Sequence, residues 1–189
     1  MRRGVTLAEV MVVCSISVML AVVLLECLLA SRKVTEHGAA RAKIQQDCRH
    51  LVNRISAMVL SAVSPDLVQD AVVRPRTDSG ASAELWFYAA DDLFGNTSFD
   101  PRNPTHHFYR VYRDGHSVML RALQDDGTPL LSIAPRQLAL KVDLLEFERP
   151  EPALLTVRVN SSEVVRGAFR TISLQAELRT TLVMLSYLL

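Results

Sequence analysis

The sequence contains few of the residues that cross-link, disorder or strongly charge a chain. Its 189 residues include three cysteines, seven glycines and eight prolines, and the formal net charge is +1. So few glycines and prolines exclude a low-complexity chain, and we find no internal repeat. The near-neutral charge gives no indication of a nucleic-acid partner held by bulk electrostatics. A chain of this length fits one globular domain with an accessory segment.

The three cysteines, Cys14, Cys27 and Cys48, all lie in the amino-terminal part of the chain. On one helix, Cys14 and Cys27 would be about 20 Å apart at ~1.5 Å per residue, whereas a disulfide needs Cα atoms within roughly 7 Å. The residues after Cys48 contain no cysteine, so packing alone must hold them together. We expect the three thiols to be small apolar side chains buried within helices.

Sequence motifs for catalysis or phosphate binding are absent. There is no glycine-rich phosphate loop, Cys-x-x-Cys, His-Glu-x-x-His or Gly-x-Ser-x-Gly. One polar stretch carries possible metal ligands: Asp91, Asp92, Asn96, Asp100, His106 and His107. Their spacing fits no EF-hand, and the adjacent histidines are not one helical turn apart. We therefore expect a solvated loop, with no catalytic residue, metal or cofactor.

A long apolar run, residues 10–30, follows the charged amino terminus and is interrupted only by Glu26. About 21 residues at ~1.5 Å per residue span a hydrocarbon core of about 30 Å. A cleaved secretory signal has an apolar core of only about 7–15 residues, so the length favours a membrane anchor. Arg2-Arg3 favours a cytoplasmic amino terminus, whereas Arg32-Lys33 beyond the run opposes it. Glu26 either marks the outer membrane boundary or pairs within an assembly.

Glu9 lies at the start of this run, in the sequence Met-Arg-Arg-Gly-Val-Thr-Leu-Ala-Glu. A carboxylate at mid-helix in a membrane costs roughly 2.5–3.5 kcal/mol, so such a residue is usually functional. The stretch resembles the class III signal of type IV prepilins and pseudopilins. The resemblance implies that residues 1–4 are a leader, that a prepilin peptidase cleaves between Gly4 and Val5, and that Val5 is then methylated. It also implies that Glu9 pairs with a positively charged amino terminus during assembly of residues 5–30.

Residues 31–64 contain no proline and one glycine, Gly38, and their apolar side chains recur with the helical period. The expected buried face is Ile44, Cys48, Leu51, Val52, Ile55, Met58, Val59, Ala62 and Val63. This pattern predicts an amphipathic helix, either continuous with residues 5–30 or broken near Gly38. The helix should end at Ser64, because the residue before a proline disfavours helix.

Residues 65–189 change to a period of two, which predicts half-buried antiparallel strands. The predicted strands cover residues 84–89, 108–113, 116–120, 138–144, 155–159 and 170–179. Asp114-Gly115 between two of them favours a two-residue type I′ turn, which would place Val111 opposite Val118. One long helix packed on an antiparallel sheet gives an α+β architecture.

A long amino-terminal helix followed by a β-rich head resembles a pilin. The hairpin sequence Tyr109-Arg110-Val111-Tyr112-Arg113-Asp114-Gly115, with Met119-Leu120-Arg121 after it, is similar to minor pseudopilins of the J type and to large minor pilins. Two features depart from the family pattern: Val5 replaces the usual phenylalanine, and the head lacks the carboxyl-terminal cysteine pair of many major pilins. The likeness therefore points to a minor subunit.

The resemblance implies a non-enzymatic structural subunit of a type II secretion pseudopilus or a type IV pilus-like filament. Its expected partners are a prepilin peptidase, other pilin or pseudopilin subunits and the lipid of a bacterial inner membrane, with the head outside the cytoplasm. The alternative is a bitopic, membrane-anchored binding protein that does not polymerise. That alternative predicts an uncut amino terminus and a dispensable Glu9.

Overall fold

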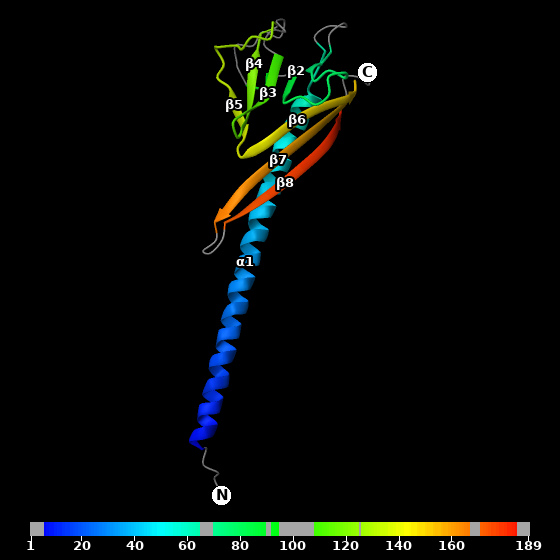
Figure 1. Cartoon of the computed structure of the whole chain (residues 1–189). Helices are drawn as coiled ribbons and strands as arrows, with labels where there is room; N and C mark the ends of the chain where they lie inside the picture. The colour runs from blue at the N-terminus through cyan, green and yellow to red at the C-terminus, as the bar shows by residue number, and fades with distance from the viewer. Residues whose placement is uncertain are drawn as a thin grey trace. The chain divides into compact units, whose positions relative to one another are not determined.

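The computed structural model describes residues 6–64, 70–89, 92–94, 108–124, 126–166 and 171–184 (Figure 1). Helix α1 comprises Leu7–Leu60. The strands that follow are β1 (Val72–Arg74), β2 (Glu84–Tyr88), β3 (Phe108–Asp114), β4 (Ser117–Leu123), β5 (Arg136–Ala139), β6 (Val142–Glu151), β7 (Leu154–Arg166) and β8 (Thr171–Val183). One long helix and antiparallel strands confirm the predicted α+β class. The chain divides into two compact units, Met1–Ala40 and Arg41–Leu189.

The strands form two antiparallel sheets, where we predicted one. Strands β1 to β5 form a five-stranded sheet in sequence order, and β6, β7 and β8 form a three-stranded sheet (Figure 1). The alternation predicted for β7 is present, because Leu155, Val157 and Val159 are fully buried while Arg158 is exposed. Consecutive strands usually pair with each other, which explains why each sheet follows the order of the sequence.

Within the second unit, the residues of α1 from Arg41 onward share one apolar core with strands of both sheets. The predicted helical face is buried at every position except Val63, which is 46% exposed. Fully buried strand side chains in this core include Leu85, Phe87, Tyr109, Val111, Val118, Phe147, Leu155, Val157 and Val159. Burial of each large apolar side chain stabilises the fold by about 1.5–3 kcal/mol, so this core replaces the disulfides that the head lacks.

Helix α1 ends at Leu60, earlier than the predicted end at Ser64. Ala62 instead forms an antiparallel bridge with Ala89, and the backbone N–H of Val63 donates to the Tyr88 carbonyl at 3.0 Å. These backbone bonds satisfy groups that a longer helix would have used internally. The backbone pairing of Ala62 and Val63 with the strand therefore ends α1 at Leu60, before the proline in the sequence is reached.

Strands β3 and β4 form the predicted hairpin, but their register differs from the prediction. Val111 lies opposite Leu120 and not opposite Val118. The two turn residues are accordingly Gly115-His116, with φ of 58° at the glycine, a position that type II′ turns reserve for glycine. Because the displacement is two residues, the same side chains still face the core.

The alternation predicted for residues 138–144 does not form one strand. Strand β5 ends before Leu140 and β6 begins at Val142, in the other sheet. Lys141 between them has a positive φ of 61°, which breaks the extended conformation. Leu140, which lies between the two strands, is therefore 62% exposed.

Two sets of contacts join the sheets within the second unit. Ser82 and Phe147 exchange backbone hydrogen bonds of 2.7 and 2.8 Å. Arg149 of β6 is 3% exposed, and it donates to the Val72 carbonyl at 2.9 Å and pairs with Asp70 at 3.3 Å. A buried guanidinium requires such partners, so Arg149 fixes the end of β6 against β1.

Candidate functional site

The predicted processing and assembly residues lie at the start of the chain. Gly4 and Val5 lie outside the described residues. Glu9 lies in the first turn of α1, and Thr6 immediately precedes the helix. The Glu9 Oε2 atom accepts hydrogen bonds from the backbone N–H of Thr6 at 2.9 Å and from its hydroxyl at 3.1 Å. The backbone N–H of Glu9 donates in return to Thr6 Oγ1 at 3.4 Å.

This reciprocal arrangement is a capping box, in which a threonine and a glutamate three residues later satisfy amides of the first helical turn. A carboxylate is also favoured there by the helix dipole. The Thr-x-x-Glu pattern ahead of an apolar run is its sequence signal. The cap was thus predictable, although our prediction for Glu9 rested on assembly alone. Glu9 has a structural role in α1 whether or not the chain assembles.

The first half of α1 presents apolar side chains on all sides. Every residue from Leu7 to Ala30 is exposed, with Leu7 at 81%. The hydroxyls of Ser15 and Ser17 donate to carbonyls one turn earlier, at 2.9 and 2.8 Å, so they remain satisfied in apolar surroundings. So large an apolar surface marks a membrane or protein contact. By length and composition, α1 can span a membrane.

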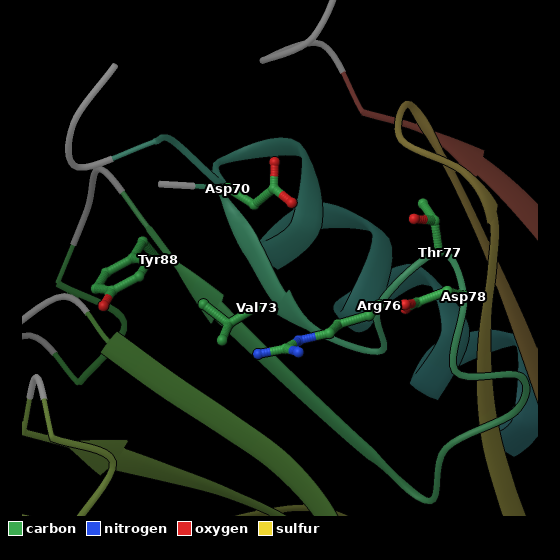
Figure 2. A pocket seen from close by; sticks show the side chains of 6 residues that line it. All are labelled: Asp70, Val73, Arg76, Thr77, Asp78 and Tyr88. Atoms are coloured by element: carbon green, nitrogen blue, oxygen red, sulfur yellow. The ribbon is translucent and has the colours of Figure 1, made fainter. Parts of the chain in front are cut away.

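The head has an open pocket beside β1, with a volume of about 510 Å³. Its lining residues are Asp70, Val73, Arg76, Thr77, Asp78 and Tyr88 (Figure 2). Figure 2 shows the Arg76 guanidinium directed towards Val73, with the Tyr88 ring beyond it. The described part of the lining contains no histidine, cysteine or lysine.

Of the polar residues predicted to form a solvated loop between positions 91 and 107, only Asp92 lies among the described residues. Its Oδ1 atom accepts hydrogen bonds from the Phe94 N–H at 2.9 Å and from the Tyr109 hydroxyl at 3.3 Å. Within the described ranges, no group of three or more histidine, cysteine or acidic side chains could hold a metal ion.

The cysteines are all free thiols. Cys48 is buried as expected, but Cys14 and Cys27 are exposed on the apolar segment of α1, so the expectation of burial was wrong for these two. Burial raises the pKa of the Cys48 thiol, with a smaller contribution from the Asp47 carboxylate. A protonated, buried thiol is unreactive, so Cys48 serves packing.

No family model, curated protein or solved structure matches this chain. The fold and the amino-terminal segment define the class of molecule coarsely. It is an α+β protein with two antiparallel sheets and one amino-terminal helix that is long and apolar enough to cross a membrane.

Proposed function

We propose that this chain is a structural minor pilin or pseudopilin subunit without enzymatic activity. A prepilin peptidase processes it, and the mature chain assembles into a type II secretion pseudopilus or a type IV pilus-like filament. The observation that carries the proposal is Glu9, a carboxylate in the first turn of an exposed apolar helix, shortly after Arg2-Arg3-Gly4. The α+β arrangement is compatible with a pilin-like fold, and the lipid partner is the inner membrane.

The charge distribution supports a specific role for Glu9. Residues 5–31 contain no lysine, arginine or histidine. Once residues 1–4 are removed, the new ammonium group of Val5 is the one cation that this segment supplies. A lone carboxylate in lipid is unfavourable, and a cationic partner offsets that cost. Pairing between Glu9 of one subunit and Val5 of a neighbour would set the axial register of assembly.

Capping and charge pairing can be separated by substitution at Glu9. Glu9→Gln keeps an acceptor for the Thr6 amide, because glutamine also completes a capping box, but it removes the charge. Thr6→Ala removes the capping hydroxyl and keeps the charge. The proposal therefore predicts that Glu9→Gln reduces assembly more than Thr6→Ala does. A purely capping role predicts that Thr6→Ala reduces assembly as much as Glu9→Gln or more.

The experiment expresses both variants with a prepilin peptidase and an assembly machinery, and measures the fraction of mature chain that sediments as filaments. We expect normal cleavage of Glu9→Gln and a loss of assembly of about tenfold or more, equivalent to ~1.4 kcal/mol or more per contact. The matched control Glu36→Gln makes the same change at an exposed position of α1 beyond the apolar run, and it should assemble normally. Wild-type assembly by Glu9→Gln would remove Glu9 from the proposed role and favour the non-polymerising alternative.

A further inference from the structure

The outward face of the five-stranded sheet carries three arginines and the chain's one tryptophan in a line. Trp86 lies opposite Arg74 on one neighbouring strand and opposite Arg110 on the other. Arg110 in turn lies opposite Arg121. Directly opposite residues of an antiparallel pair share a face, so these four side chains cross β1, β2, β3 and β4. We call them the arginine–tryptophan row.

Aromatic rings lie against two of the three guanidinium groups of the row, those of Arg74 and Arg110. The Arg74 guanidinium carbon lies 4.6 Å from the Trp86 ring centroid, and that of Arg110 lies 5.7 Å from the same centroid. Arg110 also lies 4.5 Å from the ring centroid of Tyr112. When a guanidinium group stacks on an aromatic ring, the ring contacts the flat face of the guanidinium. The N–H groups at the guanidinium edge remain available to acceptors.

The row has more donors than the described residues satisfy. Glu84 accepts hydrogen bonds from Arg110 and from the Trp86 indole N–H, the latter at 2.8 Å. Among the described residues, Arg74 and Arg121 form no hydrogen bond or ion pair, and the Nε atoms of Arg110 and Arg121 are buried without an acceptor. Counting only the residues that the structure describes, the row carries three guanidinium groups and one carboxylate, Glu84, which pairs with Arg110. The row therefore has an excess of two positive charges.

We propose that the arginine–tryptophan row is a docking surface for a carboxylate-rich segment of a partner protein. Planar carboxylates match the fork of guanidinium donors and accept two parallel hydrogen bonds. Arginine, tryptophan and tyrosine are also the residues that most often dominate binding energy at protein interfaces. The unmatched positive charge of the row defines the chemistry of the occupant.

A nucleic-acid occupant fits the row less well. Single strands bind through bases stacked on free aromatic faces. Here Trp86 is approached by guanidinium groups from both neighbouring strands, and Arg110 also lies over Tyr112. Trp86 further packs against the turn at Gly127, where an added Cβ would lie 2.9 Å from the indole. Side-chain carboxylates need only the guanidinium edges, so they fit the surface as it stands.

Trp86 provides a direct optical reporter, because the chain has no other tryptophan. The full-length chain in neutral detergent micelles is titrated with a fluorescently labelled peptide of alternating glutamate and serine. Peptide anisotropy measures binding, and Trp86 emission measures contact with the row. We expect saturable binding that changes the Trp86 emission, and no binding of the same peptide with glutamine in place of glutamate.

The decisive variant is Arg74→Gln with Arg121→Gln, and its matched control is Arg41→Gln with Arg49→Gln. The control removes the same charge from exposed positions of α1. The row variant should bind the acidic peptide about tenfold or more weakly, while the control should bind as the wild type does. Arg121→Lys keeps the charge but loses the planar fork, so it should also weaken binding.

Equal loss of binding in the control variant would overturn the proposal, since it would show attraction by net charge alone. Absence of binding by the wild type, or tighter binding of a short oligothymidylate than of the peptide, would overturn it as well. The test involves neither cleavage nor filament formation, so its failure is distinguishable from failure of the role proposed for Glu9.

Discussion

The roles of the Glu9 and Glu163 carboxylates depend on the groups that hydrogen-bond to them. Glu9 accepts hydrogen bonds from Thr6 at the start of an apolar helix, and these bonds fix the position of its carboxylate. Glu163 of β7 accepts a hydrogen bond from the Lys141 ammonium group, and this bond, aided by the charges of Lys141 and Lys43, holds the pKa of Glu163 below its usual value of about 4.5. One carboxylate caps the first turn of α1, and the other stabilises the head.

The lowered pKa of Glu163 predicts a pH-dependent contribution to stability. Because folding favours the ionised form, the contribution is present above about pH 4.5 and is lost as the pH falls through the lowered pKa. The melting temperature of the wild type should exceed that of Glu163→Gln at about pH 6, and the difference should shrink below about pH 4.5. Thermal melts across this range provide the measurement.

The control for this prediction is Glu151→Gln, at an exposed carboxylate at the end of β6. It should leave the pH dependence of the melting temperature unchanged. A difference between wild type and Glu163→Gln that stays constant from about pH 6 to about pH 3 would contradict the assignment, because an unlinked substitution has no pH-dependent effect.

Residue-level features differ in how far the sequence reveals them. The cap at Thr6 and Glu9 is encoded within four neighbouring positions, so a local pattern suffices to find it. The arginine–tryptophan row depends on the register between strands. Its first member, Arg74, lies on β1, which has three residues and pairs with β2 through an irregular register. Three residues give no alternation to recognise, so the row could not be predicted.

At the scale of elements, alternation identified strands well but located their turns poorly. The helical face from Ile44 to Ala62 followed from its period, because its burial repeats with each turn. The break between β5 and β6 at Lys141 could not be predicted, because a positive φ at a lysine has no local sequence signal. The hairpin turn lies at Gly115-His116 and not at Asp114-Gly115. Alternation cannot distinguish these two turns, because a register difference of two residues buries the same side chains.

Two glycines give opposite predictions for the same substitution. Gly115 has a φ of 58°, and a Cβ there would meet no other atom within 4 Å, so Gly115→Ala should destabilise the head by about 1 kcal/mol through backbone strain alone. Gly38 lies inside α1 with equally open surroundings, so Gly38→Ala should stabilise the helix by about 0.5–1 kcal/mol. Chemical denaturation followed by circular dichroism checks both.

Gly115→Asn serves as the control, because asparagine adopts the left-handed region more readily than alanine. It should be more stable than Gly115→Ala. Equal stability of the two variants, or stabilisation by Gly115→Ala, would show that the turn does not impose the strain inferred from its φ.

At the scale of the whole molecule, the order of parts was predictable, and the division of the strands between two sheets was not. An apolar run of membrane length and a change of period from 3.6 to two are local properties of the sequence. The division of the strands into two sheets depends on contacts between distant residues, such as the exchange of hydrogen bonds between Ser82 and Phe147. Nothing in the sequence around either residue alone specifies that contact.

The central proposal is that the chain is processed as a prepilin, and the mass of its amino-terminal peptide after co-expression with an active prepilin peptidase tests it most directly. The account predicts a product that begins at Val5, with or without a methyl group, and an uncut Gly4→Val control. Activity of the peptidase is verified on a separate prepilin in the same cells. A wild-type product that still begins at Met1 would contradict the account.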